Sequence, residues 1–478
     1  MIRKSILFLS LVCSSAIAPD VHAEVVEKVA DLQVLNLDGL GYGPSEPVDR
    51  FVQVGTNLWF TSSRGGAYDE GTISRFDLVT REVIEVASMD NDTGRRPDGA
   101  LLVIGNEGYF TTTSGGTGDR GTIAKINLET GAITTLFSFP QDRSMGATPR
   151  GALTRIGDDL WTTTSTGGND GRGTLVKYNL TSGVVTVVAH FDGPEIGSQP
   201  YEGFTQVGDA WYFTTFTGGE TFATSGLSLG AGTLGRLTFD EQGEPVITRL
   251  LSLQGGYTQF PAQNPVLVGN SLYFTTVGPN TQPGSIMRYD LDTGFATNVF
   301  LFDTNEYDPV LYGKQPGYNG LTEWNGSLYF VTRQGGTANN GVVAKFDLKS
   351  NTLTKLADLE GTGEHSLGAG TIGYNVGCVV EEDGRFYMYF PISRGGAHGK
   401  GTIIRIHLPP PPINAQLAAG DAGNLQLTWT GGYAPFTVEA TSDLSTATWT
   451  AIASGISERS VSVPMTGGNA FFRIISSE

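Results

Sequence analysis

The sequence predicts an all-β fold: a seven-bladed β-propeller that is closed by an N-terminal strand and followed by a small C-terminal β-sandwich. Three observations lead to this fold class. The chain of 478 residues contains 66 glycines and only 16% charged residues, a composition typical of short strands joined by tight turns. One four-strand pattern recurs seven times between residues 24 and 408. The seventh copy lacks its last strand, and the N-terminal segment resembles such a strand.

Each copy is marked by an aromatic strand, then in most copies a Gly-Gly pair, then a Gly-Thr-like pair that opens the next strand. The second copy is expected to contain strands at 101–104, 109–113, 122–128 and 133–139, because tight turn sequences separate these runs. Four antiparallel strands per unit is the pattern of a propeller blade. The aromatic strands of the other copies are predicted at 58–61, 160–163, 211–214, 272–275, 328–331 and 386–389.

The closure of the ring is predicted from the two ends of the repeat region. The seventh copy stops at the four prolines 409–412, without a fourth strand. Residues 26–32 (VEKVADL) closely match residues 353–359 (LTKLADL), which form the fourth strand of the sixth copy. We therefore expect the N-terminal strand to complete the last blade, where it covers an otherwise unpaired edge.

Two recurrent side chains are interpreted as structural. The aromatic residue at the second position of each aromatic strand is expected to pack one blade on the next. The Asp or Asn near the end of the third strand is expected to cap the following turn. The aromatic positions are Trp59, Tyr109, Trp161, Tyr212, Tyr273, Tyr329 and Tyr387, and the capping positions are Asp77, Asn127, Asn179, Asp290 and Asp347.

Residues 1–23 have the features of a secretory signal peptide. Arg3 and Lys4 precede the apolar run 6–12, and a small-residue cleavage site precedes Glu24. The apolar run is too short to span a bilayer, and no later segment approaches about 20 apolar residues. Removal of the signal peptide leaves Cys378 as the single cysteine of the mature chain, so no internal disulfide is expected. The protein is predicted to be exported, to the periplasm, the cell surface or the medium.

The rest of the chain divides into the propeller at 24–408, a proline linker at 409–413 and a β-sandwich module at 414–478. Alternating runs at 425–429, 436–440, 449–453, 461–463 and 471–475 are expected to be its strands. This module looks like a fibronectin-type-III-like domain.

The repeated phrase aromatic-Phe-Thr-Thr, Gly-Gly, Gly-Thr resembles the GloVer tandem-repeat proteins of exported bacterial origin. The resemblance covers all seven copies. It departs from the pattern at Gly278-Pro279, in the insertion 220–231 and at Val342, which replaces Thr. The family has no established catalytic motif, so the resemblance transfers no active-site residue.

Alternating hairpins should bring two loops of every blade to one face: the Gly-Gly loop and the proline-bearing connection into the next blade. Loops on rigid scaffolds carry function, so this longer-loop face is the expected recognition surface. Arg and Tyr suit an acidic or carbohydrate-like ligand. Taken singly, each candidate is more simply interpreted as a solvated loop residue. The candidate ligand-binding residues are Arg64, Arg95, Arg96, Arg150, Tyr201, Tyr318, Arg333, Arg394 and His398.

No catalytic residue can be assigned from motifs, and neither a metal site nor a cofactor is predicted. The net charge of −18 argues against nucleic acid as a partner. The main hypothesis is an exported, monomeric binding or cell-surface scaffold protein that recognises a polysaccharide or a cell-surface component. The alternatives are a secreted propeller lyase or hydrolase acting on polysaccharide, in which His365 and His398 could reach the longer-loop face, and a purely structural envelope protein.

Overall fold

The structure is a computed structural model, and it describes residues 24–32, 42–220, 229–254, 258–278, 283–302, 308–316, 320–369, 375–420, 424–445, 448–464 and 470–476. The predicted signal peptide and Tyr318 lie outside these residues. The chain splits into two compact units. The larger holds Val26–Cys378 and Met388–Arg405, and the smaller includes Val379–Tyr387 and Ile406–Glu478.

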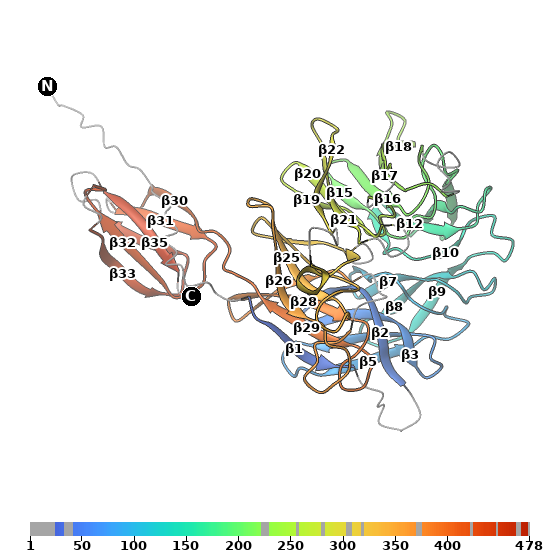
Figure 1. Cartoon of the computed structure of the whole chain (residues 1–478), viewed down its shortest axis with the longest axis horizontal. Coiled ribbons are helices and arrows are strands. Elements are labelled where there is room, and N and C mark those ends of the chain that lie inside the picture. Colours follow the sequence, from blue (N-terminus) through green and yellow to red (C-terminus); the bar gives the residue numbers. More distant parts are fainter. Residues whose placement is uncertain are drawn as a thin grey trace. The chain divides into compact units, whose positions relative to one another are not determined.

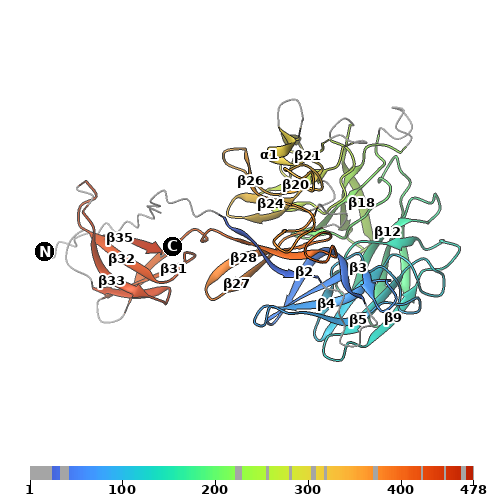
Figure 2. The same ribbon diagram turned by 60° about the horizontal axis from the view of Figure 1, so that its bottom comes forward.

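The repeats form antiparallel sheets of four or five strands, which follow one another in chain order through the larger unit (Figures 1 and 2). The first three are β2 (Tyr42–Val54), β3 (Asn57–Gly66), β4 (Thr72–Asp77) and β5 (Val83–Ser88); β6 (Leu102–Ile104), β7 (Glu107–Thr112), β8 (Thr122–Asn127) and β9 (Ile133–Ser138); and β10 (Ala147–Pro149), β11 (Thr154–Ile156), β12 (Asp159–Thr166), β13 (Thr174–Asn179) and β14 (Val185–His190).

The next three sheets have the same order. They are β15 (Thr205–Val207), β16 (Ala210–Thr215), β17 (Thr233–Phe239) and β18 (Pro245–Ser252); β19 (Val266–Val268), β20 (Ser271–Thr276), β21 (Ser285–Asp290) and β22 (Ala296–Leu301); and β23 (Thr322–Trp324), β24 (Ser327–Val331), β25 (Val342–Asp347) and β26 (Thr352–Asp358). The four-residue helix α1 (Pro309–Tyr312) precedes β23. The expected strands of the second repeat agree with β6–β9 to within two residues.

The last sheet of the repeat region contains strands from both ends of it. Its order is β1 (Val26–Asp31), β29 (Thr402–His407), β28 (Arg385–Ile392) and β27 (Cys378–Glu382). Asp31 accepts a hydrogen bond from the backbone N of Ala397 (2.8 Å) and pairs with Lys28 (2.7 Å). In the sixth repeat Asp358 accepts one from Thr337 N (3.1 Å) and pairs with Lys355 (3.0 Å). The sequence match between the two strands therefore extends to their side-chain contacts.

Hydroxyl pairs explain the recurrent Thr-Thr and Gly-Thr motifs. The last threonine of the aromatic strand meets the threonine of the Gly-Thr pair, as in Thr112···Thr122 (2.8 Å), Thr164···Thr174 (2.9 Å) and Thr215···Thr233 (2.7 Å). Gly121 must be glycine because its φ is +99° and a Cβ there would lie 2.2 Å from the carbonyl oxygen of Thr112.

A second threonine of each aromatic strand joins neighbouring sheets. Its hydroxyl donates to the carbonyl oxygen of the residue two positions after the connecting proline of the next repeat. The four described cases are Thr61 to Gly99 (3.2 Å), Thr111 to Gly151 (3.2 Å), Thr163 to Glu202 (3.0 Å) and Thr214 to Gln263 (2.8 Å). We call the accepting residue the relay position. Its carbonyl oxygen accepts the hydrogen bond that joins two neighbouring repeats.

The recurrent aromatic residues pack between sheets, as expected. Trp59 (4% exposed) belongs to a core cluster that includes Phe110 of the next repeat. Tyr273 likewise shares a cluster with Phe330 of its neighbour. In the seventh repeat the predicted register is wrong by two residues. Tyr389, which is fully buried, occupies the aromatic position, whereas Tyr387 is partly buried against His407.

The capping interpretation is confirmed. The side-chain oxygen of Asp77 accepts from the backbone N of Val79 (2.8 Å) and of Thr80 (3.0 Å), and these hydrogen bonds lower the pKa of its carboxyl. Equivalent bonds to the residues two and three further on form at Asn127, Asn179 and Asp347, and Asp290 caps Thr293.

The C-terminal residues form two three-stranded sheets that share one core. The sheet orders are β30 (Asn414–Ala419), β31 (Asn424–Thr430) and β34 (Ser460–Pro464), and β33 (Thr450–Ile456), β32 (Phe436–Thr441) and β35 (Phe471–Ser476). Leu427, Trp429, Phe436, Val438 and Phe472 from both sheets share the core. The sequence did not predict β30.

Tyr433 fastens this sandwich to the last hairpin of the repeats within the smaller unit. Its hydroxyl donates to the carbonyl oxygen of Leu408 (2.8 Å) and accepts from the backbone N of Phe386 (3.1 Å). Its ring stacks on that of Phe386 at 6.3 Å. The described part of the chain contains no helix that is long and apolar enough to cross a membrane.

Deleting residues 24–32 should lower the Tm by several degrees, because it removes the fully buried Leu32 and exposes the edge of β29. The milder Asp31→Ala should cost about 1–2 kcal/mol, and Asp358→Ala, which breaks the matching contacts of the sixth repeat, serves as its control. Thermal unfolding measures both. A deletion variant with the Tm of the wild type would contradict the role of β1.

Candidate functional site

The relay positions stand at one end of the sheets. Within a four-stranded antiparallel unit, the first strand begins at the end where the second strand finishes and the third begins. The connections into the first strands therefore share an end of the sheets with the Gly-Gly loops. This is the longer-loop face on which a recognition surface is expected.

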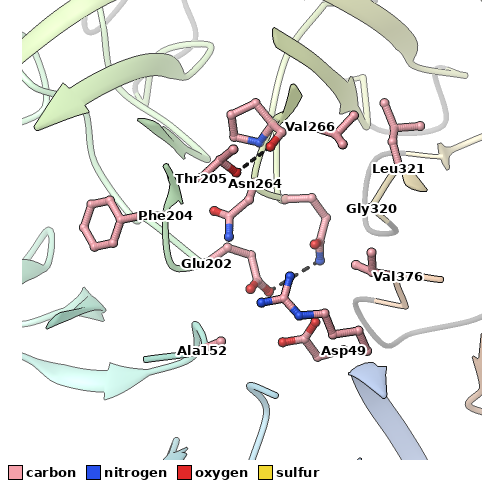
Figure 3. Close-up of a pocket in the computed structure, with 13 residues that line it drawn as sticks. Asp49, Ala152, Glu202, Phe204, Thr205, Asn264, Val266, Gly320, Leu321 and Val376 are labelled. Atoms are coloured by element: carbon pink, nitrogen blue, oxygen red, sulfur yellow. Dashed lines mark hydrogen bonds between the residues drawn. The ribbon is translucent and has the colours of Figure 1, made fainter. Parts of the chain in front are cut away.

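A pocket of ≈ 270 Å³ lies among these connections (Figure 3). Six of the seven repeats supply its lining, all from the larger unit. The lining residues are Asp49, Arg50, Ala152, Glu202, Phe204, Thr205, Gln263, Asn264, Pro265, Val266, Gly320, Leu321 and Val376. Residues that differ between the repeats thus converge on one space.

The relay position explains how the pocket is built. The threonine of the preceding repeat holds its carbonyl oxygen, while its side chain is free to vary. Glycine occupies it at Gly99 and Gly151, where a Cβ would lie 2.7 Å and 2.3 Å from backbone of the following repeat. Glu202 and Gln263 occupy it in the fourth and fifth repeats and carry side chains that line the pocket.

Two buried carboxyl groups line the pocket, and a third group nearby is partly buried. Asp49 is 3% exposed, and one of its oxygens accepts from the backbone N of Ala100 (2.6 Å). Glu202 is 4% exposed and accepts from Nε2 of Gln263 (3.4 Å). The side chain of Asp98, 14% exposed, lies 3.8 Å from the guanidinium of Arg150.

Burial raises the pKa of all three groups, because a carboxylate loses hydration there. The pKa of Asp98 rises to about 6. The pKa of Glu202 rises well above its usual value, and the negative charges of Asp49 and Asp98 raise it further. Glu202 is therefore the carboxyl group best placed to stay protonated and to donate a hydrogen bond into the pocket.

Arg50 supplies the positive charge of the lining. It is exposed, and its guanidinium forms no hydrogen bond or ion pair with the described residues. Its charge lowers the pKa of Asp49 and Glu202 against the effect of burial. A guanidinium that makes no direct ion pair can bind an anionic or hydroxyl-bearing ligand.

The structure brings two of the candidate residues together beside the pocket: the Arg150 guanidinium lies 5.1 Å from the centre of the Tyr201 ring. Three other candidates form ion pairs instead. Arg64 pairs with Asp69 (3.3 Å), and Arg394 pairs with Glu46 (3.5 Å). Arg95 pairs with both Glu70 (3.2 Å) and Asp119 (2.6 Å). Arg96 and His398 are exposed, and Arg333 is partly buried. None of these residues lines the pocket, nor does the exposed His365. Their role in binding remains a prediction.

Sequence reasoning missed Asp49, Arg50, Glu202 and Gln263. A signal for them exists: aligning the repeats on the connecting proline places Asp49, Gly99, Gly151, Glu202 and Gln263 at the same position. Acidic and amide side chains at a position that two other repeats leave as glycine indicate a role specific to those repeats.

Residues 32–226 match the family model of the Gloeobacter/Verrucomicrobia repeat. Over these residues the chain carries this repeat, and the resemblance seen in its motifs is confirmed there. No curated protein matches the sequence.

Several solved structures are similar in fold. The extracellular domain of a protein described as a one-component system from B. thetaiotaomicron has 13% identity and a TM-score of 0.50, over 85% of this chain and 46% of its own. A puromycin hydrolase has 13% identity and a TM-score of 0.46, over 86% and 62%. An oligogalacturonate lyase in complex with manganese has 13% identity and a TM-score of 0.45, over 77% and 90%. The fold is all-β, with propeller-like four-stranded sheets.

Replacing Asp98 with asparagine should make stability less dependent on pH. The raised pKa means that the folded state holds a proton which the unfolded state releases near pH 3.8. This contribution is fully present below pH 3.8 and is lost as the pH rises through about 6. Between pH 4.5 and 8 the wild type should therefore lose about 2 kcal/mol that Asp98→Asn does not lose.

Urea unfolding at the two pH values measures the difference. The control is Asp158→Asn, on a turn where the side chain is 76% exposed, and it should follow the wild type. Equal pH dependence of Asp98→Asn and wild type would show that Asp98 is ionised throughout.

Proposed function

We propose that this protein is an exported binding protein, built as a closed seven-bladed propeller, which recognises an acidic saccharide in the pocket of Figure 3. The observation that carries the proposal is the convergence of variable residues from six repeats on one pocket. Such convergence is expected of the axis of a closed ring. The pairing of β1 with β29 supports closure, because one sheet then joins the two ends of the repeat region.

The chemistry of the lining supports a saccharide. Arg50 can bind a carboxylate of the ligand, and protonated Glu202 can donate to one of its oxygens. The side-chain oxygen of Asn264 is buried without a hydrogen-bond partner among the described residues, so it can accept from a hydroxyl group. Phe204, Val266 and Leu321 add apolar surface. A few convergent polar groups on apolar walls are typical of a small-molecule site.

The predicted signal peptide supports export, and the C-terminal sandwich is proposed to be a fibronectin-type-III-like module. Its sheets pair in the orders β30-β31-β34 and β33-β32-β35. Within the smaller unit, Tyr433 joins this module to the last hairpin of the repeats.

Arg50→Gln should weaken the binding of acidic saccharides by about tenfold or more, because it removes the charge that faces the ligand while keeping a polar side chain. A glycan array with acidic and neutral saccharides, followed by calorimetry on the hits, measures the effect. Arg155→Gln is the matched control, since Arg155 is an exposed arginine that pairs with Asp158 (3.9 Å) and does not line the pocket. Absence of any saccharide binding would overturn the proposal.

Buried carboxyl groups with raised pKa support a second candidate function, glycoside hydrolysis. Protonated Glu202 would act as the general acid, and Asp49, from another repeat, as the carboxylate opposite it (Figure 3). In that case Glu202→Gln should keep saccharide binding and abolish the appearance of new reducing ends. Binding by the wild type without turnover of any array hit would exclude this candidate.

A further inference from the structure

A row of four side chains lies beside the pocket without lining it. The Arg150 guanidinium stands 5.1 Å from the centre of the Tyr201 ring. The Tyr201 and Phe216 rings lie 4.8 Å apart at 30°, and the Phe216 and Phe260 rings are stacked 5.0 Å apart at 24°. All four side chains are partly exposed. We call Arg150, Tyr201, Phe216 and Phe260 the aromatic row.

Three residues of the aromatic row lie within three residues of the pocket lining in the sequence. Tyr201 directly precedes Glu202, and Phe260 stands three residues before Gln263. Arg150 stands two residues before Ala152, another lining residue. Since consecutive Cα atoms are about 3.8 Å apart, these three residues start within about 11 Å of the pocket lining. The row therefore continues the pocket across the third, fourth and fifth repeats.

The backbone that carries Phe260 belongs to the repeat, but the aromatic side chain does not. Phe260 has φ +63°, and the other residues directly before the connecting prolines share this conformation, with φ between +54° and +58°. Those residues are Glu46, Arg96, Thr148, Gln199 and Gln315. The N–H of Phe260 is fixed by a hydrogen bond to the carbonyl oxygen of Ala231 (2.9 Å). The conformation costs a non-glycine residue about 1–2 kcal/mol, and in the fifth repeat it holds an aromatic ring on the longer-loop face.

We infer that the aromatic row is a second subsite, which holds the sugar units that adjoin the unit bound in the pocket. This inference rests on the proposed saccharide function and extends it to a chain of several units. The rings offer rigid, partly exposed apolar surface that suits the C–H faces of pyranose rings. Arg150 at one end of the row offers hydrogen-bond donors to acidic or hydroxyl groups. The ligand class is therefore an acidic oligosaccharide, and not a single sugar.

Calorimetry with galacturonic acid and its di-, tri- and tetrasaccharides tests the inference on the full chain without its predicted signal peptide. The wild type should bind the tetrasaccharide about tenfold or more tightly than the monosaccharide. Phe216→Leu and Tyr201→Leu should remove most of this gain and change monosaccharide affinity less than about twofold. Leucine keeps apolar volume, and equal Tm values would show that the fold is kept.

Two exposed aromatic residues outside the row provide matched controls. Tyr68 (68% exposed) lies in a Gly-Gly loop of the first repeat, and Phe295 (74% exposed) lies in the turn between β21 and β22. Tyr68→Leu and Phe295→Leu should bind all four saccharides like the wild type. Wild-type affinity that does not rise with chain length, or row variants that keep the gain, would overturn the second subsite while the pocket function stands. If the wild type binds none of the four, the proposed function fails first.

Discussion

One hydrogen bond, repeated from sheet to sheet, sets the geometry on which the candidate site depends. A threonine hydroxyl of the aromatic strand donates to the carbonyl oxygen at the relay position of the next repeat, as Thr163 does to Glu202. Both groups are buried, so leaving either unpaired would cost about 1–3 kcal/mol. The bond fixes the backbone just before each first strand through the carbonyl oxygen of the relay position. The side chain at that position can therefore differ from repeat to repeat. Gly99 and Gly151 make room for their neighbours, and Glu202 and Gln263 line the pocket.

The carboxyl groups in and beside the pocket are unfavourable for folding. Asp49, Asp98 and Glu202 are buried together, and each loses hydration and repels the others. Hydrogen bonds from Ala100 and Gln263 and the charges of Arg50 and Arg150 offset part of this cost. An apolar set of side chains would avoid it entirely, and strongly perturbed carboxyl groups of this kind are a feature of functional sites.

The two ends of the repeat region meet in one sheet, and the contacts there repeat those within the chain. Asp31 and Lys28 of β1 make the same kinds of contact as Asp358 and Lys355 of β26, although β1 is separated from β29 by most of the sequence. The fourth strand is thus defined by local side-chain chemistry and not by its place in the chain. Every residue that lines the pocket belongs to the larger unit.

The sequence by itself determined the repeat, its strands, the capping residues and the partner of the N-terminal strand, because these depend on local patterns that recur seven times. The repeat pattern predicts the wrong aromatic residue in the seventh repeat. It points to Tyr387, whereas the buried Tyr389 occupies the aromatic position. Only the tertiary structure decided the site. Asp49, Glu202 and Gln263 occupy the same position of three repeats, but they are far apart in the sequence, and the repeat pattern does not show that their side chains meet. They come together because the packed sheets bring these positions to one pocket, and the burial that raises the pKa of Asp49 and Glu202 exists only once the sheets have packed.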